Sequence, residues 1–148
     1  MPQTHHPFAV SHKLPSDLDR VLAYWQGLKR GAAEMPFWDD VNLGALPDLE
    51  GRLMLIDVFQ EPERFRFAIV GKDFAGQKAE GGAFLDSVTS GPPLDYLRAQ
   101  CSATVEAAGP TAHTGGGKPD DGGRYIRLLL PLWGEGQVRM ILGAVAPG

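Results

Sequence analysis

Cysteine is almost absent from this sequence, because Cys101 is the single one among 148 residues. One cysteine excludes a disulfide framework and fits a reducing compartment. Long apolar runs are absent too, since none approaches the roughly 18 residues that a membrane span needs. The first ten residues also lack the basic segment followed by an apolar one that marks a secretory signal. We therefore expect a cytoplasmic protein that has no membrane partner.

Positive charge is scarce as well. The chain holds 14 lysines and arginines against 18 aspartates and glutamates, which gives a net charge of -4. Domains that bind nucleic acid usually carry a basic surplus. The charge balance therefore predicts that nucleic acid is not a partner.

Glycine and proline, in contrast, are abundant, with 19 and 12 residues respectively. Such a content can signal disorder, but hydrophobic residues make up 43% of the chain, which is enough to bury a core. About half of the glycines and prolines fall in residues 71–93 and 109–123. We therefore expect one compact domain whose loops are concentrated in those two stretches.

The N-terminal part predicts a tail and then an amphipathic helix. Residues 1–15 contain three prolines and three of the four histidines, and they predict a flexible tail. Ser16 opens a capping pattern, so a helix is expected near residues 17–30, within an N-terminal segment 16–31. The core domain then occupies residues 32–148. The apolar stripe of the helix consists of Leu18, Val21, Leu22, Trp25 and Leu28.

The next part of the chain changes to a period of two, which is typical of strands. Residues 53–60 and 65–71 predict an antiparallel hairpin, joined by a turn that contains Pro62. On the second strand, alternation places three apolar residues on one face: Phe65, Phe67 and Ile69.

The C-terminal half predicts a helix followed by three strands. Short helical turns are expected near Phe74 and over residues 84–88. A longer helix is expected over residues 94–108, where apolar residues recur every three or four positions and Gly109 ends the pattern. Strands are then expected over residues 111–114, 124–133 and 137–146. This order of elements predicts an α+β fold with an antiparallel sheet.

The two longest strands are apolar on both faces. On residues 124–133, one face carries Ile126, Leu128, Leu130 and Leu132, and the other carries Tyr125, Leu129 and Trp133. On residues 137–146, one face carries Val138, Met140 and Leu142, and the other carries Ile141 and Val145. A sheet that is apolar on both faces must be covered on both. The N-terminal helix, or a second copy of the chain, is the natural cover for one of them. We therefore expect a homodimer, with interface candidates Leu18, Val21, Leu22, Trp25, Leu129, Trp133 and Ile141.

The motifs of common catalytic and metal sites are missing. The Gly115-Gly116-Gly117-Lys118 string lacks the Walker glycine and the serine or threonine after the lysine, so a hairpin loop is favoured. No serine stands in a G-x-S-x-G elbow. Three histidines lie in the tail without spaced partners, and His113 stands alone. We therefore predict no catalytic residue and no metal site.

Two further residues and a set of aromatic side chains leave alternatives open. Cys101 lies on the apolar face of its helix, which favours a buried and inert thiol over a redox sensor. Asp57 lies inside an apolar strand, where it either blocks aggregation at an edge or faces a polar pocket. The aromatic residues either fill the core or line a ligand cavity. The cavity candidates are Asp57, Phe67, Ile69, Phe74, Phe84, Tyr96, Cys101, Leu128 and Leu130.

Short motifs follow one another in a definite order along residues 17–146. The first group reads Tyr24-Trp25-x-x-Leu28-Lys29-Arg30-Gly31, then Pro36, then Leu46-Pro47-x-Leu49. The second reads Leu55-Ile56-Asp57-Val58, Phe65-Arg66-Phe67 and Ile69-Val70-Gly71. The third reads Arg127-Leu128-Leu129-Leu130-Pro131-Leu132 and Ile141-Leu142-Gly143. In this order and spacing, the chain resembles the single-domain PAS-like proteins of bacteria.

The resemblance implies a five-stranded antiparallel sheet with helices over one face and the N-terminal helix against the other. It also implies a sensory or protein-interaction module, of a kind that often dimerises and sometimes holds haem, flavin or a small organic ligand. The sequence departs from the pattern at Ala68, at Lys72 and in residues 77–84. The longer helix carries no histidine for haem, and the flavin-binding cysteine motif is missing, so neither cofactor is expected.

Three functions follow from this reading. The first is a bacterial signalling module that binds a small organic ligand or a partner protein and acts in trans. The second is a structural, dimerising adaptor with a filled core and no ligand. The third is a small enzyme, which the motif survey makes the weakest of the three. A cavity with convergent polar groups favours the first over the second.

Overall fold

The computed structural model describes residues 8–10, 13–74, 80–87, 93–116 and 123–147. Within these residues the chain forms two α-helices, α1 (Ser16–Gly27) and α2 (Leu97–Ala107). The strands are β1 (Leu53–Gln60), β2 (Glu63–Val70), β3 (Thr111–Gly115), β4 (Tyr125–Gly134) and β5 (Gln137–Pro147). Short 3-10 helices are η1 (Trp38–Asp40), η2 (Leu43–Ala45), η3 (Glu50–Arg52), η4 (Lys72–Phe74) and η5 (Leu85–Ser87).

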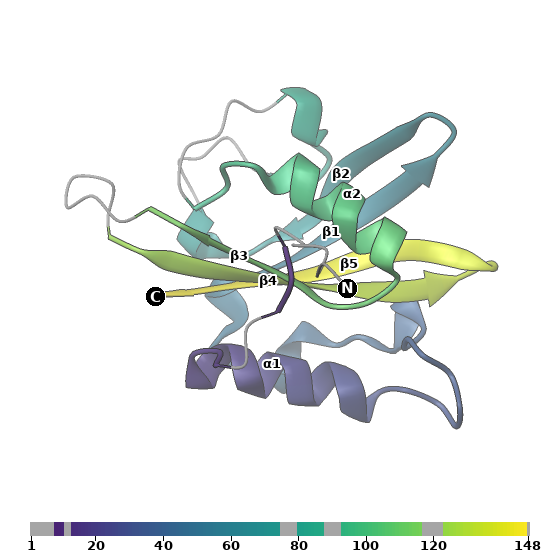
Figure 1. Ribbon diagram of the computed structural model, residues 1–148, viewed down its shortest axis with the longest axis horizontal. Coiled ribbons are helices and arrows are strands. Elements are labelled where there is room, and N and C mark those ends of the chain that lie inside the picture. Colours follow the sequence, from purple (N-terminus) through teal and green to yellow (C-terminus); the bar gives the residue numbers. More distant parts are fainter. Residues whose placement is uncertain (1–7, 11–12, 75–79, 88–92, 117–122, 148) are drawn as a thin grey trace, which may run out of the picture.

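The five strands form one antiparallel sheet in the order β2-β1-β5-β4-β3. Helix α1 lies on one side of this sheet and α2 on the other (Figure 1). The predicted α+β class and the five-stranded antiparallel sheet are therefore confirmed. We call the side under α1 the α1 face and the side under α2 the α2 face.

Helix α1 differs from its prediction at both ends. Its N-cap is Pro15, Ser16 is already helical, and no side chain caps the first turn, so the predicted serine cap is wrong. The helix ends at Gly27, and Lys29 and Arg30 lie beyond it. Arg30 instead forms an ion pair with Asp40 at 2.7 Å, which holds the following connection to the end of α1.

Helix α2 begins three residues later than predicted, because Tyr96 adopts a left-handed backbone conformation with φ of 60°. It ends at Ala107, and Ala108, one residue before the predicted terminator Gly109, takes a left-handed conformation with φ of 50°. Glycine is the usual residue there because it has no Cβ to clash. The short helical turns that were predicted near Phe74 and over residues 84–88 correspond to η4 and η5, and residue 88 lies outside the described residues.

The first hairpin matches its prediction along β1 but not along β2. Leu55 pairs with Ile69 and Ile56 pairs with Phe67, so Ala68 is the extra residue of a β-bulge. A bulge breaks the strict alternation of a strand. Ile69 therefore leaves the face of Phe67 and is 49% exposed, and its predicted place beside Phe67 is wrong.

The core fills both faces of the sheet. Three residues of the α1 stripe, Leu18, Val21 and Trp25, are at most 2% exposed, and Leu22 is partly buried. The predicted cover of one sheet face by this helix is therefore present within a single chain. Trp25 also donates a hydrogen bond from Nε1 to the carbonyl oxygen of Pro131 at 2.8 Å, which ties α1 to β4.

Candidate ligand pocket

The residues predicted to line a cavity divide between the two faces of the sheet. Arg127 and Thr111 both form hydrogen bonds with Gln100 of α2, so their side chains lie on the α2 face. Leu129 pairs with Thr111 and follows Arg127 by two positions, so it shares that face. Leu128 and Leu130 alternate with these residues and lie on the α1 face. The sequence assigned Leu128 and Leu130 to the ligand cavity and Leu129 to the interface with the N-terminal helix. The structure places these leucines on the opposite faces, so the predicted sides are reversed.

The predicted interface residues are also distributed over both faces. Ile141 pairs with Pro131 and lies with Leu129 on the α2 face, and both residues are fully buried. Trp133 is partly buried near the end of β4, where it bridges to Phe37. The buried helix residues and both sheet residues contact their own chain, so a second copy would have to use another surface. The homodimer itself stays a prediction.

Asp57 is an ion-pair anchor on the α1 face. Its Oδ2 atom accepts hydrogen bonds from Nε and Nη2 of Arg66 at 3.0 and 2.8 Å. Its Oδ1 atom lies 3.6 Å from Nη1 of Arg139 on β5. The carboxylate therefore links β1 to the strands on both sides, and it does not line the pocket described below.

The other cavity candidates have different surroundings. Phe67 and Cys101 are buried in the core, and burial raises the pKa of the Cys101 thiol to about 12. The ring of Phe84 contacts the tilted ring of Phe59, with 5.9 Å between centroids, and the guanidinium of Arg64 lies 3.8 Å from the Phe84 centroid. Tyr96 is 69% exposed at the start of α2. Of the nine candidates, the pocket contains one, Phe74 of η4.

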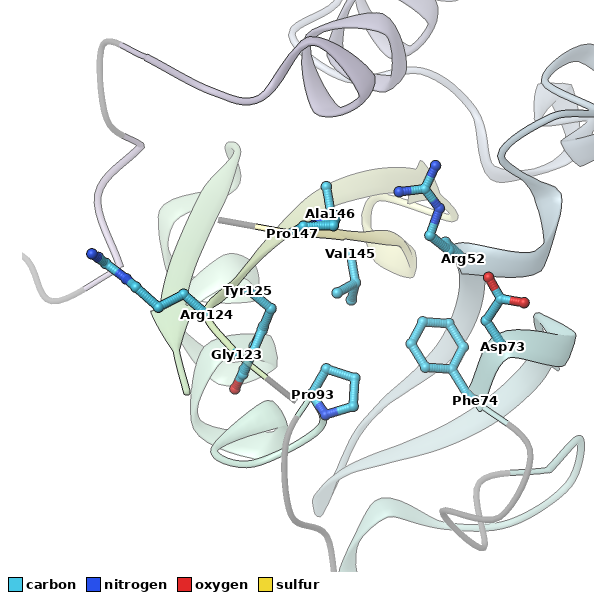
Figure 2. Close-up of a pocket in the computed structure, with 10 residues that line it drawn as sticks. All are labelled: Arg52, Asp73, Phe74, Pro93, Gly123, Arg124, Tyr125, Val145, Ala146 and Pro147. Atoms are coloured by element: carbon cyan, nitrogen blue, oxygen red, sulfur yellow. The ribbon is translucent and has the colours of Figure 1, made fainter. Parts of the chain in front are cut away.

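A pocket of about 350 Å³ lies between η3, η4, the residues before α2 and the adjoining ends of β4 and β5. Figure 2 shows Phe74, Pro93 and Val145 around its interior and the guanidinium of Arg124 pointing away from it. Arg52 and Asp73 lie together on one side. The lining residues are Arg52, Asp73, Phe74, Pro93, Gly123, Arg124, Tyr125, Val145, Ala146 and Pro147.

A buried polar network adjoins this pocket on the α2 face. Arg127 is fully buried and donates from Nε to Oε1 of Gln100 at 2.8 Å. Its Nη1 and Nη2 atoms donate to the backbone oxygens of Pro93 and Asp95 at 2.8 and 3.0 Å. The guanidinium is thus held by uncharged acceptors, and burial lowers the pKa of Arg127. The network fixes Pro93, which is one wall of the pocket.

Gln100 extends this network into α2 and β3. Its Nε2 atom donates to Oγ1 of Thr111 at 3.1 Å and to the carbonyl oxygen of Arg127 at 3.3 Å. The hydroxyls of Thr104 and Thr111 lie 2.6 Å apart, and Thr104 also donates to the carbonyl oxygen of Gln100. The side chain of Gln100 therefore joins α2 to both β3 and β4.

Tyr125 connects the network to the pocket. Its hydroxyl donates to the carboxylate of Asp95, and burial, with that hydrogen bond, raises the pKa of Tyr125. A phenol with a raised pKa stays protonated at neutral pH, so Tyr125 acts as a hydrogen-bond donor and not as a general base. The ring centroids of His113 and Tyr125 lie 5.8 Å apart. The Nε2 atom of His113 has no hydrogen-bond partner among the described residues.

Sequence reasoning missed Arg127, Gln100, Tyr125 and Asp95 as a group. One signal was available, because Arg127 is the only charged residue between Tyr125 and Trp133. Charged residues inside apolar strands are rarely buried without partners. The partners come from α2 and from the residues before it, and no motif connects them to β4.

The fold and the pocket define an α+β domain with a ligand-sized pocket at one end of its sheet. No family model, no curated protein and no solved structure matches this chain. Within the described residues, no group of histidine, cysteine and acidic side chains is arranged to hold a metal ion. No helix in the described part of the chain is both long and apolar enough to cross a membrane.

Proposed function

We propose that this chain is a PAS-like sensory module that binds a small organic ligand in the pocket beside β4 and β5. The observation that carries the proposal is the pocket itself. Its volume of about 350 Å³ lies within the range of small-molecule sites, and apolar residues form most of its lining. Asp73 gives a bound molecule a point of orientation, as do Arg52, which also pairs with Asp17 at 2.8 Å, and Tyr125, whose hydroxyl also donates to Asp95.

The layout of the fold supports the PAS-like part of the proposal. The family resemblance implies a five-stranded antiparallel sheet with the N-terminal helix on one face and helices on the other. The chain has such a sheet, with α1 and α2 on opposite sides (Figure 1). A signalling role as a cytoplasmic module, acting on a partner protein, follows from the resemblance alone.

The pocket favours ligand binding over the two alternatives. A purely structural adaptor needs no concave and mostly apolar pocket of this size. An enzyme needs an activated group. The raised pKa values of Tyr125 and Cys101 keep both groups protonated, which is opposite to what a base or a nucleophile requires.

The test is native mass spectrometry of the full chain purified from cells. We expect a mass adduct of a small organic molecule that is lost on unfolding. The variant Val145→Phe places a ring inside the pocket and should abolish the adduct. The variant Ile69→Phe places the same ring at an exposed position and should retain it. A wild-type chain that shows no adduct, and no thermal stabilisation by a library of small organic molecules, would contradict the proposal.

The cofactor expectation has its own readout. We propose that the ligand is neither haem nor flavin, because the sequence lacks the residues through which related modules hold them. The purified protein should therefore show neither a Soret band nor a flavin absorption band. Either band, at an amount comparable to the protein, would overturn this part of the proposal.

A further inference from the structure

The outer edge of β3 is covered by a short segment from the N-terminal region. In the strand order, β3 is an edge strand, so its outward backbone groups have no neighbouring strand. The amide of Ala112 instead donates to the carbonyl oxygen of Phe8 at 2.9 Å. The ring of Phe8 packs against His113, with 6.0 Å between the ring centroids. Figure 1 shows this segment crossing β3.

This segment, residues 8–10, forms hydrogen bonds with only part of the outward backbone groups of β3. Amides of an antiparallel strand point alternately to its two sides, so the amide of Thr114 points outward like that of Ala112. Among the described residues, the bond from Ala112 to Phe8 is the one backbone hydrogen bond between the segment and the edge. Thr114 is exposed. Residues 8–10 therefore leave the outward amide of Thr114 without a backbone partner among the described residues.

The segment also leaves space beneath it. An open groove of about 420 Å³ is lined by the segment, α1 and the end of α2, and we call this groove the cavity beside the segment. Its walls are Phe8, Ala9, Val10, Leu22, Gln26, Ala107, Pro110 and Thr111. Residues 8–10 thus form one wall of this groove and leave it open.

We propose that the β3 edge and this cavity form a docking site for an extended peptide segment of a partner protein. The peptide pairs with the β3 edge, places an aromatic side chain on His113 and inserts a large apolar side chain into the cavity. Residues 8–10 occupy the site in the absence of the partner. This proposal uses a surface apart from the pocket beside β4 and β5, and it does not depend on a ligand there.

The chemistry of the occupant follows from the segment that lies there now. The segment shows that the edge accepts a backbone carbonyl and that His113 accepts an aromatic ring. The unfilled cavity shows that a bulkier apolar residue would fit better than Val10. Nε2 of His113 also lacks a hydrogen-bond partner among the described residues. Strand addition at a free sheet edge gives affinity through backbone hydrogen bonds and specificity through side-chain pockets.

The test measures binding of a fluorescein-labelled peptide, Ser-Phe-Ala-Leu-Thr-Lys, to the full chain by fluorescence anisotropy. The control peptide carries serine in place of phenylalanine, and we expect it to bind at least about ten-fold more weakly. The variant Phe8→Ser weakens the contact of the chain's own segment. Because the competing segment then occupies the site less often, the labelled peptide should bind about ten-fold more tightly.

A second pair of variants tests the cavity. Ala107→Trp fills it from the exposed end of α2, and peptide binding should fall at least about ten-fold. Glu106→Trp adds the same ring one position away, outside the lining residues, and should leave binding unchanged. Circular dichroism and thermal unfolding of both variants serve as the folding control. A loss of binding is assigned to the filled cavity only in a variant that folds like the wild type.

Three results would overturn the proposal. The first is an affinity that is equal for the two peptides. The second is an affinity that Phe8→Ser leaves unchanged or weakens. The third is a wild-type chain that sediments as a dimer, becomes a monomer on Phe8→Ser, and binds neither peptide. That last result would mean that the segment of a second copy, and not a partner peptide, occupies the site.

Discussion

The two faces of the sheet are both buried, but they are built from different chemistry. On the α1 face, leucines of β4 and β5 pack under Leu18, Val21 and Trp25. On the α2 face, Arg127, Gln100 and two threonines form hydrogen bonds within the core. One face thus depends on apolar area and shape, and the other on complete pairing of polar atoms.

This difference determines how each face responds to substitution. Apolar contacts are numerous and individually weak, so an apolar face loses stability in proportion to the volume removed. A buried polar network responds to the removal of one member with the desolvation penalty of every group left unpaired. The pocket lies beside the polar network, so we expect ligand binding to be coupled to the α2 face.

The largest expected effect comes from Trp25 on the α1 face. Trp25→Ala removes a large buried side chain and its hydrogen bond to Pro131, and should lower the free energy of unfolding by about 3–5 kcal/mol. Trp25→Phe keeps a ring but loses the bond, and should cost about 1–2 kcal/mol. Urea unfolding followed by circular dichroism measures both. A Trp25→Ala chain as stable as Trp25→Phe would contradict the apolar account of this face.

The next effect tests the polar network. Gln100→Leu removes the acceptor of Arg127 Nε and the donor to Thr111, and should cost about 3 kcal/mol. Adding Arg127→Met to that variant removes the unpaired charge, and should recover part of the loss. Urea unfolding of the wild-type chain, both single variants and the double variant completes the cycle. Strictly additive losses would show that the two residues do not act together.

The sequence predicted the elements better than their details. Apolar periodicity located β1 and the stripe of α1, because those residues repeat at regular spacing and meet an apolar sheet. It placed Ile69 wrongly because the bulge at Ala68 depends on how β1 and β2 pair, and one strand alone does not specify that. It placed the start of α2 wrongly because the left-handed conformation of Tyr96 is unusual for a non-glycine residue.

The pocket was harder to predict than the fold. Its walls come from Arg52, Phe74, Pro93 and Val145, which are far apart in the sequence and share no motif. The buried network was equally hidden, because Gln100 alone in a helix pattern resembles a solvent-facing residue. A prediction of such sites needs the packing of α2 on the sheet, which is decided by the whole core.

A smaller effect should come from Thr104 at the margin of the network. Its hydroxyl donates to the carbonyl oxygen of Gln100 and lies 2.6 Å from the hydroxyl of Thr111. Thr104→Val keeps the shape and removes these bonds, and should cost about 1–2 kcal/mol. Thr104→Ser keeps the hydroxyl and is the matched control, with a loss from one methyl group alone. Urea unfolding that ranks the serine variant below the valine variant would show that shape, and not polar pairing, dominates on the α2 face too.

The smallest effect concerns His113, the one histidine among the described residues. Burial, together with the nearby charge of Arg127, lowers its pKa in the folded chain. At pH values between this lowered pKa and the ordinary value of about 6.5, the unfolded chain binds a proton that the folded chain does not. The stabilisation that comes from keeping His113 neutral should therefore be complete above about pH 7, and the free energy of unfolding should decrease as the pH falls below 6.5. The α1 face carries no histidine among the described residues.

Urea unfolding between pH 5.5 and 8 should show a shallower pH dependence for His113→Gln than for the wild type. An equal pH dependence of the free energy of unfolding in the two chains would show that the imidazole binds a proton as readily in the folded chain as in the unfolded one. His113 would then not belong to the buried polar groups of the α2 face.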